Sequence, residues 1–468
     1  MGIDFSDYLK STADKKNPVT TVTNMVQHPT GFMYLDYGCG SYLTVYDEDE
    51  APIKQYHNVG ITSGSVNVII SKTQGGKTSL AIEMGMAIIE PYISKFLYQK
   101  HIEALRDKKH REPDTDGMPF IQILDTEKTL PIDYVKKLTK YKNSWLNKYV
   151  TINQITTDTD CMKAIESHIK YKVEHMAIDV APIPDVFGKP IMEYPPTVII
   201  LDSATQLLIE DVDDPMSKKG GVGDVYGNAT QNTAGARRAK IISALYSQMV
   251  NYAKRYNIII FSVNHINKMP AMMGIPVKQF AGLRAGESLS GGERAIYLAS
   301  NILRLDRIKN IGGTASSAIN MGDDVTGHIV IASWIKSKSN SKRNTCQMVY
   351  DNIDGYDQLL STLWNAKELG TLAKSGNFYH LDEYPQYRFT FKNYKDVFSE
   401  HPEMFVAYYN QFRDECAKML DNPEAATIAA QKEMDKIRKD LRKEGEVMGY
   451  TKSDMMDLDD IYSGMVNN

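Results

Sequence analysis

Six apolar runs of strand length follow one another through the middle of this 468-residue chain. Several are apolar throughout, which is typical of strands buried on both faces of a sheet. Helix-length amphipathic segments, such as Leu80–Ile89 and Ala236–Tyr256, separate them. The pattern predicts an α/β fold with a mainly parallel central sheet, whose strands are expected at 66–70, 120–124, 197–201, 258–263, 300–305 and 329–334.

The composition limits the class of protein. With 42% hydrophobic and 24% charged residues it is near the globular average, which excludes a collagenous, coiled-coil or wholly disordered chain. No apolar run approaches the ~20 residues that span a bilayer, and the first residues lack a basic-then-apolar signal layout. We therefore expect a cytoplasmic protein with no membrane partner. Because the net charge is −4, a nucleic-acid binder of this composition must concentrate its positive charge on one surface.

Changes in character along the chain divide it into five parts. The apolar runs define the central part, an aromatic and helical sequence follows it, and the last residues are acidic. The expected parts are an N-terminal extension at 1–60, a core at 61–358, a small C-terminal α/β domain at 359–420, an amphipathic helix at 421–450 and an acidic tail at 451–468.

Four local expectations refine this division. Short strands are expected around Gly31–Tyr46, and the amphipathic helix itself is expected at 423–444. A charged stretch at 98–118 and a Pro-rich stretch at 181–196 look inserted into the core. Both are predicted to be surface loops, since charge and proline are typical of exposed connections.

The segment Ser71–Thr78, SKTQGGKT, carries the most specific local signal. It stands between an apolar run and a helix, which is the context of a phosphate-binding P-loop. Glycines let backbone N–H groups face phosphate oxygens, and the helix N-terminus adds its positive end. Lys77 would reach the terminal phosphates of ATP, and Thr78 would ligate Mg²⁺. The alternative is a helix-capping turn. The expected ATP-binding residues here are Ser71, Lys72, Thr73, Gln74, Gly75, Gly76, Lys77 and Thr78.

Ser71 departs from the usual P-loop pattern, which has a glycine at this first position. A positive φ would be strained for serine, whereas glycine adopts it freely.

Polar residues follow three of the other apolar runs. Asp202 comes after 197–201 and is expected to bind ATP and hold Mg²⁺. Glu127 follows 120–124 and is predicted to be the base that orients the attacking water; the alternative is a solvated turn. His265 follows 258–263 and could sense the terminal phosphate, or merely satisfy a hydrogen bond. Ligands bind at the carboxyl ends of parallel strands, where all three side chains should meet.

In this arrangement the chain resembles the RecA-fold strand-exchange proteins, and most closely the bacteriophage UvsX-type recombinases. The resemblance runs from about Gly64 to Phe412. Its pieces, in family order, are the P-loop, Asp125-Thr126-Glu127 with Tyr134, Asp202-Ser203, Gln231 through Arg238-Ala239-Lys240, Asn264-His265, Gly291-Gly292, Tyr297–Ser300, and Lys336-Ser-Lys338 leading to Lys342-Arg343.

The resemblance assigns further residues. It implies a RecA-like P-loop ATPase core, in which Tyr134 stacks on adenine and Lys336 and Lys338 complete the ATP site of a neighbouring subunit. It also places subunit docking in the N-terminal extension and two DNA-binding loops at Glu210–Gln231 and Ile266–Arg294. The first loop is rich in glycine and could equally be an ordinary surface loop. The expected DNA-binding residues are Lys218, Lys219, Lys268, Lys278, Phe280, Arg284 and Arg294.

The leading hypothesis is an ATP-dependent DNA recombinase that acts in DNA recombination and repair. As a DNA-dependent ATPase it would form helical filaments on single-stranded DNA, pair that strand with homologous duplex DNA and exchange strands. A single-strand-binding protein and a loader are further partners to consider, in the cytoplasm of a bacterial host if the protein is phage-encoded. Two alternatives stay open. One is a hexameric DNA helicase of the same fold, and the other is a nucleotide-gated assembly protein that acts without DNA.

Overall fold

A computed structural model describes most of the chain between Val26 and Leu420. The helix expected at 423–444 and the acidic tail lie outside the described residues. The described ranges are 26–46, 52–72, 74–106, 115–139, 148–185, 188–204, 206–209, 231–268, 283–284, 286–289, 294–312 and 326–420.

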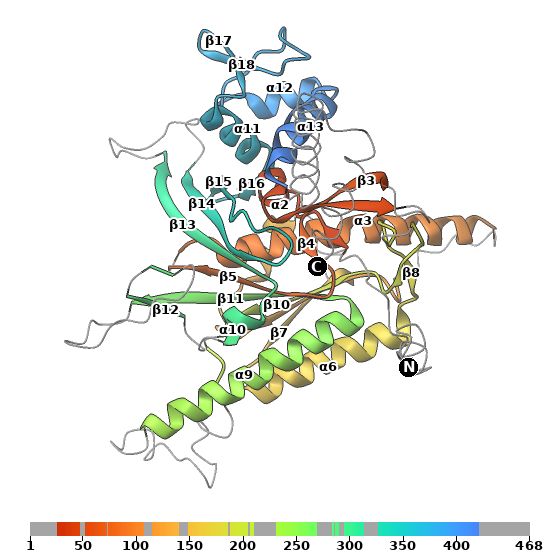
Figure 1. The fold of residues 1–468 in the computed structure, drawn as a ribbon, viewed down its shortest axis with the longest axis vertical. Coiled ribbons are helices and arrows are strands. Elements are labelled where there is room, and N and C mark those ends of the chain that lie inside the picture. Colours follow the sequence, from red (N-terminus) through yellow and green to blue (C-terminus); the bar gives the residue numbers. More distant parts are fainter. Residues whose placement is uncertain are drawn as a thin grey trace, which may run out of the picture. The chain divides into compact units, whose positions relative to one another are not determined.

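A large β-sheet lies at the centre of the described residues (Figure 1). Its path is β16–β15–β14–β13–β5–β11–β10–β6–β7, and β12 pairs with β11 beside it. The links from β13 to β7 are parallel, whereas β13 to β16 are joined by antiparallel pairs. The strands are β5 (Val66–Ser71), β6 (Ile121–Asp125), β7 (Val150–Gln154), β10 (Thr197–Asp202), β11 (Ile258–Lys268), β12 (Glu287–Leu289), β13 (Asn301–Ile311), β14 (Gly327–Ser337), β15 (Thr345–Asp351) and β16 (Gly355–Asp357).

Each of the six apolar runs expected to form a strand does so, and an α/β fold with a mainly parallel central sheet is confirmed. Both faces of the sheet are buried. In β10, Val198 and Ile200 join one apolar cluster, while Ile199 joins the cluster on the other face. Successive side chains of a strand point to opposite faces, so a strand that is apolar throughout needs a cover on each side.

Different helices provide the two covers. Helices α6 (Asp158–His175) and α9 (Gln231–Tyr256) lie side by side on one face, as Figure 1 shows. Helix α3 (Lys77–Arg106) contributes to the apolar cluster on the other face, together with α4 (Ile132–Thr139). Helix α9 begins five residues earlier than the predicted Ala236.

The prediction of a surface loop at 98–118 was wrong for its first part, because α3 continues to Arg106. Ile93 is buried, and Phe96 and Leu97 pack against the same apolar cluster, so tertiary contacts extend the helix beyond Pro91. The second stretch, 181–196, contains one short strand, β9 (Met192–Glu193), which pairs with β8 (Asp179–Val180) just before the stretch.

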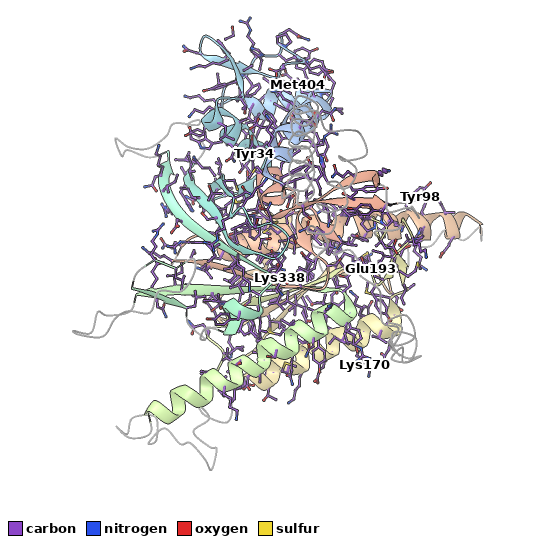
Figure 2. The ribbon with its side chains drawn as sticks, in the orientation of Figure 1. Tyr34, Tyr98, Lys170, Glu193, Lys338 and Met404 are labelled. Carbon is purple, nitrogen blue, oxygen red and sulfur yellow. The ribbon has the colours of Figure 1, made fainter. Side chains whose placement is uncertain are left out.

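The prediction of short strands around Gly31–Tyr46 is confirmed for Ser41–Tyr46, which form β2, and was wrong for Met33–Cys39, which form a helix, α2. Every residue of α2 is buried, and Tyr34 donates a hydrogen bond to Glu415 (2.7 Å) in the C-terminal region; Figure 2 labels Tyr34. The remaining strands here are β1 (Gln27–His28), β2 (Ser41–Tyr46), β3 (Pro52–Asn58) and β4 (Ile61–Thr62).

The C-terminal region is mainly helical, with one small hairpin. Its apolar side chains share a cluster with α2 and α3, and residues up to Leu420 form one compact unit. Its elements are α11 (Gln358–Leu369), β17 (Ala373–Ser375), β18 (Phe378–His380), α12 (Tyr394–Glu400), α13 (Met404–Cys416) and a 3-10 turn at Ala417–Met419. Within the described part of the chain, no helix has the length and apolar character needed to cross a membrane.

Candidate functional site

A hollow of about 580 Å³ lies where the carboxyl ends of β5, β6, β10 and β11 meet. This is the edge at which open α/β sheets bind ligands. The structure brings most of the predicted site residues together here. The lining includes Gln74, Gly75, Gly76, Lys77, Thr78, Glu127, Tyr134, Asp202 and His265. Thr73 lies outside the described residues.

The loop between β5 and α3 has the backbone geometry of a tight turn. Gln74 and Gly76 adopt left-handed conformations, with φ of 60° and 73°. A Cβ at Gly76 would lie 2.4 Å from the hydroxyl of Tyr356, so space as well as φ requires glycine there. Ser71 ends β5 and is not among the residues with positive φ, so the strain that a serine would suffer does not arise.

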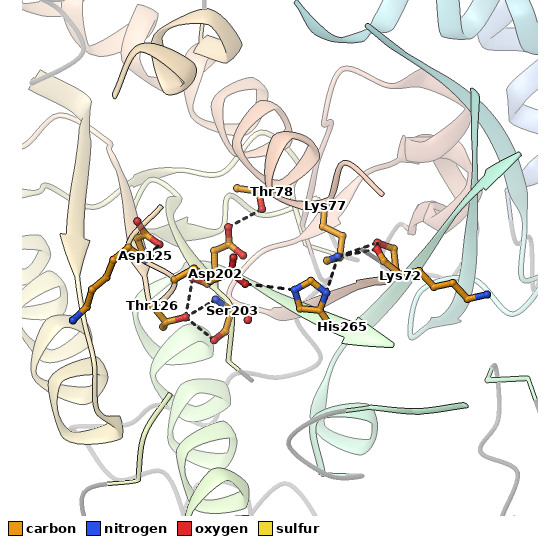
Figure 3. Close-up of polar contacts among 11 residues, drawn as sticks. Lys72, Lys77, Thr78, Asp125, Thr126, Asp202, Ser203 and His265 are labelled. Carbon is orange, nitrogen blue, oxygen red and sulfur yellow. Dashed lines mark hydrogen bonds and ion pairs between the residues drawn. The ribbon is translucent and has the colours of Figure 1, made fainter. Parts of the chain in front are cut away.

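Lys77 is buried at the start of α3, and its ammonium group is held by the loop. It donates to Ser71 Oγ (3.0 Å) and to the carbonyl of Lys72 (3.2 Å), as Figure 3 shows. Burial lowers the pKa of Lys77 to about 8, against the raising influence of the Asp202 and Glu127 carboxylates. A buried cation with neutral partners is suited to an anionic ligand.

The next residue, Thr78, reaches the carboxylate of Asp202. Its hydroxyl donates to Asp202 Oδ2 (2.6 Å). Burial raises the pKa of Asp202 to about 6, while the hydrogen bond from Thr78 opposes that rise. Thr126 ties β6 to the same point, because its hydroxyl accepts from the N–H of Ser203 (2.8 Å). The two residues predicted to bind Mg²⁺ are therefore adjacent and anchored.

Glu127 and His265 complete a chain of contacts. His265 Nδ1 lies 3.4 Å from Lys77 Nζ, and its Nε2 lies 3.5 Å from Glu127 Oε1. Because an ammonium group only donates, this arrangement is satisfied when Nδ1 accepts and Nε2 carries the proton. Asp125 shapes the turn that contains Glu127 by accepting from the N–H groups of Lys128 (2.8 Å) and Leu130 (3.2 Å). The Glu127 carboxylate is thus held at the wall of the hollow.

Hydroxyl groups from three elements meet at the wall of the hollow, around Ser79, which follows Thr78 in the sequence of α3. Tyr134 on α4 contacts Ser79 Oγ, and its hydroxyl lies 3.2 Å from that of Tyr350 on β15. Sequence reasoning missed four lining residues from the antiparallel strands and the turn after them, Arg307, His328, Tyr350 and Asn352. No motif marks them, because strand order alone brings them to this hollow.

The residues that could hold a cation are few. Among the described residues, no three His, Cys, Asp or Glu side chains are grouped as a metal site requires. The hydroxyl–carboxylate pair of Thr78 and Asp202 offers hard oxygen ligands, which suit Mg²⁺ when a phosphate ligand and water supply the rest. The donor set therefore fits a magnesium–nucleotide complex better than a metal ion alone.

Lys336 and Lys338 lie far from this hollow. The N–H of Lys338 donates to the carbonyl of Ser300, whose own N–H donates to the carbonyl of Val66, at the start of β5. The loop between β5 and α3 follows the other end of that strand, which is five residues and about 16 Å away. Neither lysine lines the hollow of its own chain.

The two lysines also differ in their contacts. Lys336 Nζ donates to the carbonyls of Ile296 (2.7 Å) and Tyr297 (2.8 Å), near the end of α10 (Arg294–Leu298). Burial lowers the pKa of Lys336, and the charge of Lys338 lowers it further. Lys336 thus has a structural partner in its own chain.

Only one of the expected DNA-binding side chains is described, that of Arg284. It is exposed and pairs with Asp306 (3.0 Å), beside the buried pair of Arg304 and Glu287 (2.6 Å). These pairs fasten Arg284 and Glu287, which belong to the second expected DNA-binding loop, to β13. Lys218, Lys219, Lys278 and Phe280 lie outside the described residues, as do the side chains of Lys268 and Arg294.

Comparison with known proteins adds no identification. No protein-family model matches the chain, and no curated protein matches its sequence.

Proposed function

We propose that this protein is an ATP-dependent DNA recombinase of the RecA fold. The observation that carries the proposal is the convergence of Lys77, Thr78, Asp202 and Glu127 on one hollow at the carboxyl edge of a parallel sheet. A buried cation, a hydroxyl–carboxylate pair and a second carboxylate are the parts that phosphoryl transfer to water requires.

Each residue has a role in this proposal. Lys77 and the N–H groups of the glycine loop would hold the phosphates, and Thr78 and Asp202 would hold Mg²⁺. Bound Mg²⁺ would neutralise phosphate charge. Glu127 would orient the attacking water, and His265, which links Glu127 to Lys77, would report on the terminal phosphate. Tyr134 and Tyr350 line the same hollow, and we propose that they contact the nucleobase.

The position of Lys336 and Lys338 supports an assembly in which subunits share active sites. A lysine side chain extends about 6 Å, which is much less than the ~16 Å that separates Lys338 from the phosphate loop along β5. If these cations act on ATP, they must act on the ATP of another copy. Hydrolysis would then depend on assembly, which suits a filament that forms on single-stranded DNA.

ATP turnover with and without single-stranded DNA tests the proposal, in wild type and in Lys77→Ala. We expect turnover that DNA stimulates and that Lys77→Ala abolishes, because the ammonium group stabilises phosphoryl charge. Lys100→Ala, on the exposed part of the same helix, is the matched control and should keep wild-type turnover. Turnover within tenfold of wild type in Lys77→Ala would remove the site assignment.

Electron microscopy of the protein with ATP and single-stranded DNA separates the alternatives. Open helical filaments on DNA support the recombinase. Closed rings would favour a helicase, and assemblies with DNA-independent turnover would favour a nucleotide-gated assembly protein.

A further inference from the structure

Tyr356 on β16 lies directly behind the phosphate loop. Its hydroxyl donates to the carbonyl of Gly75 (3.2 Å), and the same oxygen leaves no room for a Cβ at Gly76. β16 is the edge strand of the sheet and is not a neighbour of β5 in it. Because β16 packs against α3, the helix that follows the loop, Tyr356 nevertheless reaches the loop. Tyr356 is therefore in contact with the turn that the proposed function assigns to phosphate.

The position of Tyr356 is fixed on several sides. Its N–H donates to Glu83 Oε1 (2.9 Å) on α3. Its ring is buried and packs edge-on against Phe32 (centroids 6.1 Å apart) and Tyr350 (4.9 Å). The next residue, Asp357, caps α11 by accepting from the N–H of Leu360 (2.8 Å). The hydroxyl is thus presented to the loop by a rigid support.

The direction of the hydrogen bond has a consequence for the loop. In a planar trans peptide the C=O and the following N–H point in opposite directions. The carbonyl of Gly75 is held toward Tyr356, so the N–H of Gly76 points away from Tyr356. A loop of this kind binds phosphate through such N–H groups, and a peptide that flips loses the donor.

We infer that Tyr356 is a positioning residue that holds the Gly75–Gly76 peptide in its phosphate-binding orientation. The inference rests on the proposed function, since it assumes that the hollow binds a nucleotide. The bond from Tyr356 does not involve the reacting atoms, so it contributes equally to the bound substrate and to the transition state. Its loss should raise KM and leave kcat unchanged.

The test compares Tyr356→Phe with Tyr34→Phe in the full-length protein. Both variants remove a buried hydroxyl that donates one hydrogen bond, but Tyr34 donates to Glu415 and does not line the hollow. Dissociation constants for Mg·ADP, KM and kcat for ATP, and melting temperatures are measured for each. For Tyr356→Phe we expect Kd and KM to rise about tenfold, with kcat within about twofold of wild type. For Tyr34→Phe we expect a lower melting temperature and an unchanged Kd.

Two results would overturn the inference while the proposed function stands. One is wild-type affinity for Mg·ADP in Tyr356→Phe, when wild type binds and Lys77→Ala does not. The other is an equal loss of affinity in Tyr34→Phe, which would mean that Tyr356 acts only through general stability. If wild type itself fails to bind Mg·ADP, the proposed function fails and the inference fails with it.

Discussion

Mixing two inactive variants tests whether Lys338 acts across a subunit interface. Lys338→Ala keeps Lys77 and lacks the cation that we propose acts on a neighbouring subunit, whereas Lys77→Ala keeps Lys338 and lacks the lysine of its own proposed ATP site. Lys338 lies about 16 Å along β5 from the loop of its own chain, so it cannot rescue its own site. Alone, Lys338→Ala should bind nucleotide normally and lose roughly 10²–10³-fold in hydrolysis, the cost of one lost transition-state donor.

Lys336→Ala should behave differently from Lys338→Ala. Lys336 donates to two carbonyls near the end of α10, so its removal should cost about 1–2 kcal/mol of unfolding free energy. No comparable contact holds the side chain of Lys338 among the bonds of the described residues, and its removal should change stability by less than about 0.5 kcal/mol. Lys338→Ala is therefore the cleaner variant for mixing.

The assay measures DNA-stimulated ATP turnover after equal amounts of the two variants are mixed and shown by microscopy to share filaments. A working junction needs an intact loop on one side and an intact Lys338 on the other. With random mixing, half of the subunits have an intact loop and the other half have an intact Lys338. About one quarter of the junctions then have both in the right order, so turnover should recover to about one quarter of wild type if junctions act independently. No recovery in verified mixed filaments would refute the role across the interface and favour a self-contained ATPase.

Two further predictions concern single carboxylates. Glu127→Gln should keep nucleotide affinity and lower hydrolysis by roughly 10²-fold, because the amide cannot orient water as a base; unchanged single-turnover rates would assign the base elsewhere. Asp36 is buried, and burial raises its pKa to about 7 against hydrogen bonds from Thr30. The unfolded chain binds fewer protons there between about pH 4 and 7, so this group makes the unfolding free energy fall as pH rises through that window. Urea titrations at pH 5 and pH 8 measure this change in the unfolding free energy. The change between the two pH values should be smaller in Asp36→Asn than in wild type, and an equal change in both proteins would contradict the assignment.

Local patterns were enough to predict the parallel part of the sheet except β7, whose sequence VTINQ has three polar residues and no apolar run. A strand that is apolar throughout has few alternatives to a place between two layers of helices, so β5, β6, β10 and β11 are visible as runs of letters. Because these strands are parallel, their carboxyl ends lie at the same edge of the sheet. The meeting of Lys77, Glu127, Asp202 and His265 follows from those two facts, because each residue lies near that edge. Asp202 ends β10, Glu127 follows β6 and Lys77 begins the helix after β5. His265 lies within β11, at the level of Ser71, where β5 ends.

The other half of the hollow depends on contacts between segments remote in sequence. Tyr356 touches Gly75 across 281 positions, and Tyr350 reaches Tyr134 across 216, because three antiparallel pairings carry β14, β15 and β16 beyond β13. Helix α2 could not be predicted from its sequence either. All seven of its residues are buried, so it has no polar face and no helical period in its sequence. Its conformation is set by the apolar surfaces that surround it, and those surfaces exist only once the chain has folded.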